Sequence, residues 1–547
     1  MVREYTGWVG SMFSFYTASR LRRSVMNPAP PEEIIQLLKL ALEIKHHNAL
    51  ASDENRRSLR ILVLGGSVTA GIGCYWPDNL GVPPAKHWSI PGENCVWSYF
   101  LERLLNQVIF EGKDIVKIDN IASGGISSEF GALALEYQLF PDPDRVPDVV
   151  IYAFSANDAQ EPNPKAVFYE YLQNFVAAAH WLNPCDNHAP LVILLDDFYA
   201  DVPPSVALQQ TGNIYMLSHW NNLMAVDYSS TVGSKVIVED LAWAPLLSSN
   251  VQMHSGVGMH MGIAWTILYN LLDSMVNVCN DVGLQTIRPD RITENKANAS
   301  KNILPREHDD HNALTIDPRI SSNLEKGEPP MQHFGKVREM VKDASYVRLQ
   351  LEENVNRTKE VCSELSAKGK EKSPLRCSWS WFFNKSTNFV HSAQVRNKMN
   401  EVLLFNNGWA AEGRPVAQPR SGWYSHSPNS EFAMKIENIA ADLNFVVMLT
   451  MKSYSSKWVG SKLAVSTMVV KNSTTPDAVT NQASPVDWDN DDSLFYIDGF
   501  HEIKTSVHFP HKVPIRGGAS PGDSVIVYAK LVGGSEFKFA GMAFCAY

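Results

Sequence analysis

Short apolar runs alternate with helical patterns between about Leu59 and Asp281, and this alternation constrains the fold more than any other feature. The runs are Ile61–Leu64, Ile115–Ile118, Val149–Phe154, Leu191–Leu195 and Lys235–Val238. The segments between them have apolar residues at helical spacing, as in Val96–Phe110, Phe130–Leu139 and Ala166–Leu182. This pattern predicts a parallel sheet with helices on both faces. In such sheets, functional residues gather at the carboxyl ends of the strands.

The pattern divides the 547 residues into four segments. Residues 1–57 form an N-terminal extension that we expect to be helical or partly disordered, and residues 58–284 form the α/β domain. Residues 285–375 are polar and are typical of a linker with a helix. Residues 376–547 contain strand patterns separated by Gly, Pro, Asn and Ser clusters, which predicts a jelly-roll-like β-sandwich. The clearest of these strands are Phe432–Ile436, Asn444–Met451, Leu463–Val470 and Val525–Leu531.

Composition excludes several classes of protein. The chain has 48 Lys and Arg against 58 Asp and Glu, a net charge of −10. Nucleic-acid-binding proteins usually carry a basic excess, so we expect no nucleic-acid partner. No apolar run reaches the roughly 18 residues of a membrane helix, so we expect no integral membrane segment. Tyr5–Ser19 is a weak signal-peptide pattern, which favours the secretory pathway or the extracellular space over the cytoplasm without fixing the compartment. The sequence does not determine the oligomeric state.

The sharpest motif is Arg60-Ile-Leu-Val-Leu-Gly-Gly-Ser-Val-Thr-Ala-Gly71, in which a strand leads into two glycines and then Ser67. A hydroxyl directly after a strand, beside glycines that allow a tight turn, is well placed as a nucleophile. The alternative is a strand-to-helix turn in which Ser67 caps the helix. A phosphate-binding loop does not fit, because neither G-x-G-x-x-G nor G-x-x-x-x-G-K-[ST] is present.

Three further motifs follow along the chain. Asp119-Asn-Ile-Ala-Ser-Gly-Gly-Ile-Ser-Ser128 begins at the end of the next strand, and its glycines could bring a backbone N–H near an oxyanion. Asn157 lies just past Val149–Phe154, where its amide could donate to the same oxyanion. His254 precedes a helical pattern. Each motif also has an ordinary structural interpretation: a glycine turn, an Asx turn and a solvated loop histidine.

Taken together and in this order, the four motifs resemble the SGNH, or GDSL-type, hydrolase superfamily, in the N-terminal half only. The Gly-Asp-Ser block of that family reads Gly65-Gly66-Ser67 here. The glycine of the family's second block falls best on Gly125. The family's Gly-x-Asn-Asp block reads Ser155-Ala156-Asn157-Asp158 here. His254 lies ten residues before the alanine of an Ile-Ala pair, as the histidine of the family does.

The resemblance implies a flavodoxin-like sheet and a serine esterase without a metal or organic cofactor. Ser67 would attack an ester carbonyl, with His254 as general base and then general acid. The oxyanion would be held by the backbone N–H groups of Ser67 and Gly125 and by the Asn157 amide. The substrate would be a carboxylic ester, and an acylated polysaccharide is a hypothesis by analogy alone.

One departure from the family concerns the acid that usually lies three residues before the histidine, where Val251 stands. Control of the imidazole tautomer weakens without it. A degenerate hydrolase fold that binds carbohydrate or protein therefore stays open as an alternative. An acyltransferase also stays open, because the sequence does not distinguish acyl transfer from hydrolysis. Glu239 or Asp240 could replace the acid, because they follow the last predicted strand. A backbone carbonyl or a water could orient His254 instead, whereas His260 is expected to pack against the start of the helix.

Other motifs are interpreted as structural. Gly518-Ala-Ser-Pro-Gly522 and Gly522-Asp-Ser524 match serine-hydrolase patterns, but we expect neither a strand before them nor a helix after them. His308–His311 and the aspartates of Asp487–Asp492 lack the spacing of metal sites. The C-terminal tryptophans fit a sandwich core better than a sugar-binding surface. They are Trp379, Trp381, Trp409, Trp423, Trp458 and Trp488.

Two cysteine pairs are candidates for disulfides. Cys377 and Cys545 lie near the two ends of the predicted sandwich, where a bridge would join its last strand to its first. Cys74 and Cys95 flank a loop that follows Ser67. The alternative for each pair is two free, buried thiols.

Overall fold

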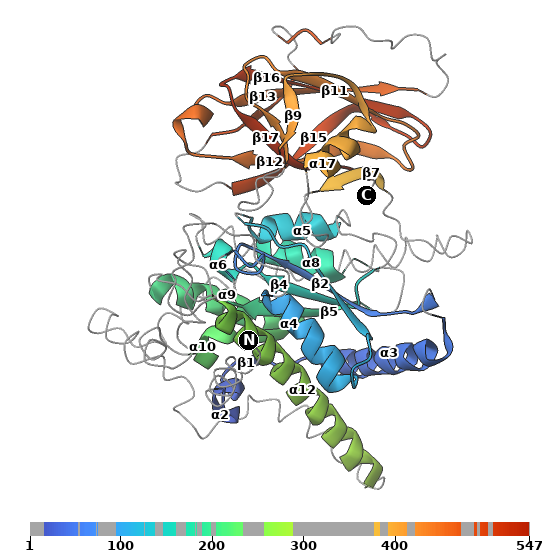
Figure 1. The fold of residues 1–547 in the computed structure, drawn as a ribbon, viewed down its shortest axis with the longest axis vertical. Coiled ribbons are helices and arrows are strands. Elements are labelled where there is room, and N and C mark those ends of the chain that lie inside the picture. The colour runs from blue at the N-terminus through green and yellow to red at the C-terminus, as the bar shows by residue number, and fades with distance from the viewer. Residues whose placement is uncertain are drawn as a thin grey trace.

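The computed structural model contains a helix-covered sheet and, next to it, a β-sandwich (Figure 1). It describes residues 16–52, 55–72, 74, 95–124, 126–136, 146–159, 171–180, 182, 189–197, 204–232, 256–287, 377–382, 392–412, 422–471, 486–488, 493–500 and 507–545.

The first part is built on a six-stranded sheet of order β1-β6-β5-β4-β2-β3. Its strands are β1 (Val25–Asn27), β2 (Leu59–Gly65), β3 (Val116–Asn120), β4 (Val149–Ala153), β5 (Leu191–Asp196) and β6 (Met224–Asp227). All neighbours are parallel except β1, which pairs antiparallel with β6 at the edge. The order β3-β2-β4-β5-β6 is the flavodoxin-like order that the sequence predicts. The chain reverses direction across the sheet between β2 and β4, and ligands bind such sheets beside the carboxyl ends of those strands.

Both faces of this sheet are buried, which explains why its central strands are apolar throughout. Every residue of β2, β4, β5 and β6 is buried. Along β2, Ile61 and Val63 join one core, and Leu62 and Leu64 join the other. The first core is covered by α3 (Pro31–Leu50), α4 (Trp97–Leu104) and α12 (Val257–Ile287). The second is covered by α5 (Ser128–Glu136), α8 (Gln173–His180) and α9 (Pro204–Asn221).

Shorter elements complete this part of the chain. They are α2 (Ala18–Arg22), a π-helical turn (Leu105–Ile109), α6 (Ser155–Asp158) and α10 (Tyr228–Val232). Four of the predicted strands are confirmed as β2 to β5. The fifth, Lys235–Val238, lies outside the described residues, and the fifth parallel strand is β6 instead. β6 has only four residues and follows α9 almost directly, so it forms no distinct apolar run in the sequence.

The second part consists of two antiparallel sheets around one core, as a sandwich requires. One has β15 (Val507–Ala519), β12 (Leu443–Lys452), β17 (Phe537–Cys545), β10 (Gly422–Ser425) and β9 (Trp409–Glu412), with β7 (Cys377–Phe382) also on β17. The other has β14 (Phe495–Asp498), β13 (Lys462–Val470), β16 (Ser524–Gly533), β11 (Glu431–Ile436) and β8 (Leu403–Asn407). Helix α17 (Ser392–Asn400) and a 3₁₀ turn (Ser456–Trp458) join strands. The four predicted strands are confirmed as β11, β12, β13 and β16.

The tryptophans of the sandwich are core residues, as the sequence predicts. Five of them are at most 9% exposed: Trp379, Trp381, Trp409, Trp423 and Trp458. The sixth, Trp488, is half-buried and donates from Nε1 to Glu431 at 3.1 Å. Aromatic rings with so little free surface cannot stack on a sugar, so these five provide no carbohydrate-binding platform.

The serine-hydrolase decoys lie in a turn between β15 and β16. The expectation that no strand precedes them is wrong, because β15 runs to Ala519. A strand rather than a helix follows, so the context of a nucleophile elbow is still missing. The Ser520 N–H donates to Asp523 Oδ2 at 2.9 Å, and Lys471 pairs with the same oxygen at 2.8 Å.

The two parts share an apolar core. Val447 and Leu449 of β12 and Ala543 of β17 belong to the same cluster as the buried residues of α5. At the rim of this contact, Lys512 of β15 pairs with Glu136 at the end of α5 (3.2 Å). Figure 1 accordingly shows α5 and α8 as the helices nearest to the sandwich. The sandwich therefore packs on the helix that follows the second glycine motif.

Three cysteines of the two predicted pairs are disulfide-bonded in the structure. Cys74 and Cys95 form a disulfide with a Cα–Cα distance of 5.8 Å, which confirms that pair. Cys545 is also disulfide-bonded, and the residue opposite it in the β7–β17 register is Cys377. The bridge between Cys377 and Cys545 stays a prediction. Cys279 is a free, exposed thiol.

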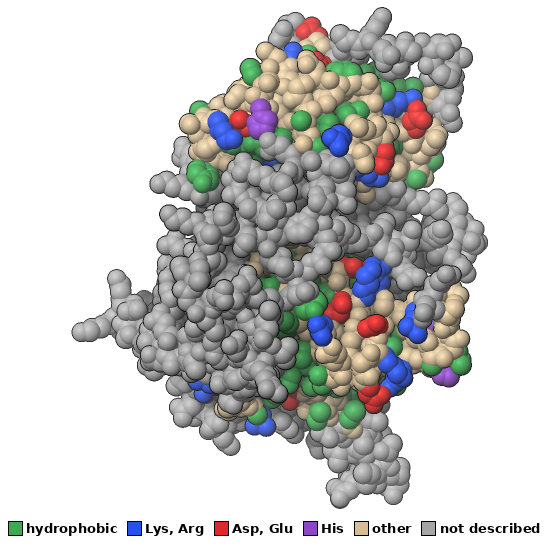
Figure 2. All heavy atoms as spheres, in the orientation of Figure 1, with side chains coloured by type: hydrophobic (Ala, Val, Ile, Leu, Met, Phe, Trp, Pro, Cys, Tyr) green, Lys and Arg blue, Asp and Glu red, His purple; other side chains and the backbone are tan. Residues whose placement is uncertain are grey.

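The described surface has no dominant charge on the face shown in Figure 2, where cationic and anionic side chains are interspersed over both parts. The absence of a nucleic-acid partner stays an expectation, which rests on the acidic net charge. Among the described helices, none is long and apolar enough to span a bilayer.

The shared core leads to a stability prediction. Leu449→Ala should lower the free energy of unfolding by ~2–5 kcal/mol, because it removes a side chain that is 4% exposed between the two parts. Val459→Ala is the matched control in the same sandwich, since Val459 is 58% exposed and should change stability by less than about 0.5 kcal/mol. Urea unfolding of both variants measures the difference. Equal effects would show that Leu449 does not lie in a packed contact.

Candidate active site

The turn after β2 places Ser67 at the carboxyl end of the sheet. The Gly66 N–H donates to the Ala153 carbonyl of the neighbouring strand β4 at 3.2 Å. The chain then turns into a helical loop, in which the Ala70 N–H donates to the Gly66 carbonyl (2.9 Å) and the Ile72 N–H to that of Ser67 (3.0 Å). Ser67 itself is half-buried. Ser67 therefore follows a strand end, as the sequence pattern predicts, and its role as a nucleophile stays a prediction.

The two glycines before Ser67 let this turn lie close to the end of β4 and to the Asn157 side chain. A Cβ on Gly65 would lie 2.5 Å from the Ala153 carbonyl oxygen, and one on Gly66 would lie 1.7 Å from Asn157 Oδ1. Both distances are far below van der Waals contact. In this chain the space above Gly66 is filled by Asn157, which gives a physical reason for glycine where the family pattern has aspartate.

Asn157 lies in α6, the single helical turn that follows β4. Its Oδ1 accepts a hydrogen bond from the Ser67 backbone N–H at 3.4 Å. Asn157 is half-buried. The structure thus brings together two of the four predicted site residues, Ser67 and Asn157.

The loop after β3 covers the same turn from the other side. The Ser123 N–H donates to the Gly65 carbonyl at 3.0 Å, and Asn120 Nδ2 donates to the Thr69 carbonyl at 2.9 Å. A Cβ on Gly124 would lie 3.8 Å from Ser67 Cβ. Gly125, the predicted oxyanion donor, lies outside the described residues, but its neighbour Gly124 lies beside Ser67.

The histidine and its candidate acids cannot be placed, because His254, Val251, Glu239 and Asp240 lie outside the described residues. The helix that follows His254 begins at Val257, in agreement with the sequence pattern. His260 is fully buried in the first turns of this helix. Its Nδ1 accepts from the Trp97 N–H at 3.3 Å, so His260, in the first turns of its own helix, contacts the start of a different helix, α4.

A buried carboxyl, Asp197, lies under the site and was missed by the sequence analysis. It follows β5 directly, and its Oδ1 accepts from the Ser155 hydroxyl at 2.7 Å. The Thr69 hydroxyl lies 3.1 Å from its Oδ2. Burial raises the pKa of Asp197 to about 7, although the hydrogen bond from the Ser155 hydroxyl stabilises the ionised carboxylate and lowers the pKa. The signal was available: Asp196 and Asp197 follow an apolar strand, as Asn157 does.

A second buried carboxyl fixes the position of α5. Asp158 Oδ2 accepts from the Tyr152 hydroxyl at 2.6 Å, and its Oδ1 accepts from the Ser128 N–H at the start of α5 at 2.9 Å. Gln210 donates to the Tyr152 oxygen at 3.1 Å. Burial raises the pKa of Asp158 to about 6, although the Tyr152 hydrogen bond opposes the shift. Asp158 therefore links the Asn157 turn to the helix on which the sandwich packs.

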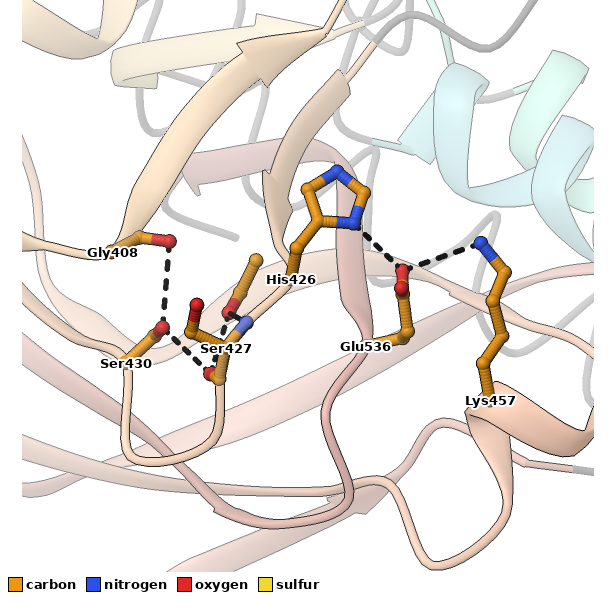
Figure 3. Close-up of polar contacts among 7 residues, drawn as sticks. Gly408, His426, Ser427, Ser430, Lys457 and Glu536 are labelled. Atoms are coloured by element: carbon orange, nitrogen blue, oxygen red, sulfur yellow. Dashed lines mark hydrogen bonds and ion pairs between the residues drawn. The ribbon is translucent and has the colours of Figure 1, made fainter.

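A His–Glu pair also occurs in the sandwich, at the end where β10 stops and β17 starts (Figure 3). Glu536 Oε2 lies 3.0 Å from His426 Nδ1 and 3.6 Å from Lys457 Nζ. The serines drawn beside it form turn contacts: the Ser430 hydroxyl donates to the Ser427 carbonyl at 2.7 Å. His426 and Lys457 are about half exposed, so solvent screens their attraction to Glu536, whose side chain is 11% exposed. We assign no catalytic role to this cluster.

Within the described residues, no group of three or more His, Cys, Asp or Glu side chains is arranged to hold a metal ion. The His308–His311 segment lies outside the described residues, and so does most of the Asp487–Asp492 segment.

The contact between Gly66 and Asn157 gives a testable coupling. Gly66→Ala should lower the free energy of unfolding by ~1–3 kcal/mol, because the new Cβ forces the two turns apart. The three atoms nearest to that Cβ all belong to the Asn157 amide. In an Asn157→Ala background the same change should therefore cost much less. Urea unfolding of the four proteins measures this coupling, and an equal cost in both backgrounds would contradict the contact.

Comparisons with known proteins show similarity of fold only. No family model matches the chain, and no curated protein matches it. A member of the lipolytic protein G-D-S-L family from Veillonella parvula DSM 2008 is 14% identical, with a TM-score of 0.26 over 38% of this chain and 96% of that one. The structure of TesA is 16% identical, with a TM-score of 0.28 over 39% and 99%. Tail fiber protein gp63.1 from E. coli phage G7C is 10% identical, with a TM-score of 0.30 over 95% and 49%.

Similarities of this size give no reason to assume a shared activity. The assignment of this chain to a fold type therefore rests on the order of its strands and of its sequence motifs. On that basis, the N-terminal half of the chain resembles the SGNH hydrolases in its flavodoxin-like sheet and in a serine, a glycine loop and an asparagine at three neighbouring strand ends.

Proposed function

We propose that the chain is a serine esterase that cleaves a carboxylic ester through Ser67. The observation that carries this proposal is the 3.4 Å contact between the Ser67 N–H and the Asn157 amide, at the carboxyl ends of adjacent strands. Acyl transfer needs a nucleophile with hydrogen-bond donors beside it, aimed at the oxygen that becomes negative.

In the proposed reaction, Ser67 Oγ attacks the ester carbonyl carbon while His254 takes the hydroxyl proton. The carbonyl oxygen becomes an oxyanion, held by the N–H groups of Ser67 and Gly125 and by Asn157 Nδ2. The Asn157 amide has to turn end for end, which frees the Ser67 N–H and points Nδ2 at the substrate. Collapse releases the alcohol, which takes the proton from His254. Water then attacks the acyl-enzyme in the same way and regenerates Ser67.

The partner of the His254 ring stays a prediction. An aspartate or glutamate usually holds the imidazole in the correct tautomer, and Val251 cannot do so. If neither Glu239 nor Asp240 reaches the ring, a Ser67–His254 dyad would act alone, with slower turnover than a complete triad.

A carboxylic ester is the proposed substrate class, and an acylated glycan stays a prediction. The tryptophans that could have indicated sugar binding are buried in the sandwich core. The Cys74–Cys95 disulfide supports an oxidising compartment, in which an extracellular ester would be accessible.

The nucleophile can be tested with p-nitrophenyl esters of short and long chains. Ser67→Ala should abolish cleavage and leave the fold intact, because it removes the attacking oxygen and little volume. Ser520→Ala and Ser524→Ala are matched controls, since these serines stand in the motifs that imitate a hydrolase site, and both should keep wild-type turnover. Wild-type turnover in Ser67→Ala would disprove the assignment.

The oxyanion donor can be tested separately. Asn157→Ala should lower kcat by ~100-fold or more with a smaller effect on KM, because the lost hydrogen bond forms mainly in the transition state. Steady-state kinetics on the best ester of the screen measures this. An unchanged kcat would mean that Asn157 is only a turn residue.

A further inference from the structure

Asp197 joins the two turns that carry the proposed nucleophile and oxyanion donor. Thr69 contacts Asp197 Oδ2 and comes two residues after Ser67. Ser155 contacts Asp197 Oδ1 and comes two residues before Asn157. The Asp197 N–H also donates to Ser155 Oγ at 3.0 Å, which fixes the carboxyl against the β4 turn. Asp197 is 1% exposed, and both hydroxyl residues are fully buried.

Counting hydrogens around Thr69 indicates which form of Asp197 fits this geometry. The Thr69 hydroxyl has one hydrogen, yet it lies 3.1 Å from both Asp197 Oδ2 and the Ala153 carbonyl oxygen. With an ionised Asp197, only one of these acceptors can receive that hydrogen. A neutral Asp197 supplies the second hydrogen: its own O–H donates to Thr69 Oγ1, and Thr69 donates to Ala153.

The Ala153 carbonyl connects this hydrogen bond to the nucleophile. It also accepts from the Gly66 N–H at 3.2 Å, directly before Ser67. A chain of hydrogen bonds therefore runs from Asp197 through Thr69 and Ala153 to the backbone that positions Ser67. Through Ser155, the same carboxyl holds the turn that positions Asn157.

The other titratable groups around Asp197 disfavour a negative charge there. Asp158 of α6 raises its pKa, Asp196 of β5 precedes it in the chain and has its own pKa raised by Asp197, and the Tyr152 hydroxyl of β4 lies in the same cluster. Asp196 in turn faces Asp227 at the end of β6. None of these groups is cationic at neutral pH, and burial is the largest cause that raises the pKa of Asp197 to about 7, with a smaller contribution from Asp158.

We propose that Asp197 is a positioning residue, held as a neutral carboxylic acid, that joins the Ser67 turn to the Asn157 turn and sets the upper pH limit of the esterase. The inference rests on the proposed function. Ionisation of Asp197 would draw the Thr69 hydrogen away from Ala153 and bury a negative charge beneath the forming oxyanion. Both effects disfavour the transition state, so turnover falls as pH rises through the pKa of Asp197.

Asp197→Asn is the sharpest variant, because the amide keeps the shape, donates to Thr69 and accepts from Ser155, but cannot ionise. We expect near-wild-type kcat at pH 6. The ratio of variant kcat to wild-type kcat should rise about tenfold by pH 8, since a group with a pKa of about 7 is then only about one-tenth neutral. The titration of His254 occurs in both proteins and cancels in this ratio.

Glu33→Gln is the matched control. Glu33 lies in the first turn of α3, and burial raises its pKa to about 7 as well. If the loss of turnover at alkaline pH came from the ionisation of any buried acid, Glu33→Gln would raise the ratio of variant kcat to wild-type kcat by the same factor. We expect its kcat ratio to stay flat between pH 6 and 8.

An infrared difference spectrum tests the neutral carboxyl without any substrate. At pH 6, wild type minus Asp197→Asn should show the C=O stretch of a protonated carboxylic acid, and its absence would overturn the proposal whatever the activity. If the band is present and Ser67→Ala is inactive, a flat Asp197→Asn ratio overturns the positioning role alone. If Ser67→Ala is fully active, the proposed function fails, and the pH-limit proposal fails with it.

Discussion

The side chain of Asn157 lies over Gly66, and the rest of the site depends on this close approach. It is possible because β2 and β4 are neighbours in a parallel sheet, so the turns after them meet at one edge. Glycine at position 66 leaves room for the amide, and the amide then reaches the Ser67 N–H. A side chain at that position would separate the two turns. The departure from the Gly-Asp-Ser pattern is therefore part of how this chain builds its site.

Beneath that contact, buried carboxyls connect the site to the rest of the molecule. Asp197 joins the Ser67 and Asn157 turns through two hydroxyls, and Asp158 joins the Asn157 turn to the start of α5. Helix α5 packs in turn on the sandwich. The sandwich thus packs on the helix whose start is held by Asp158.

Much of the fold could be predicted because strands buried on both faces leave an apolar run in the sequence. β2 to β5 and the order of motifs were predictable for that reason, and so was Asn157, which follows such a run. β6 was not, since four residues directly after a helix form no separate pattern. Asp197 follows β5 just as Asn157 follows β4, but its role depends on Thr69 and Ser155, which are distant in sequence. The strand before the Gly-Asp-Ser decoy was missed because Pro and Gly interrupt it.

The most direct test of the Ser67 site is to label the folded protein with a fluorophosphonate and to map the modified peptide by mass spectrometry. An activated serine beside an oxyanion hole attacks phosphorus, whereas an ordinary surface serine does not. The proposed mechanism predicts one adduct, on Ser67, that forms much more slowly in Asn157→Ala. An adduct on another serine, or none on a protein whose Cys74–Cys95 disulfide is intact, would contradict it.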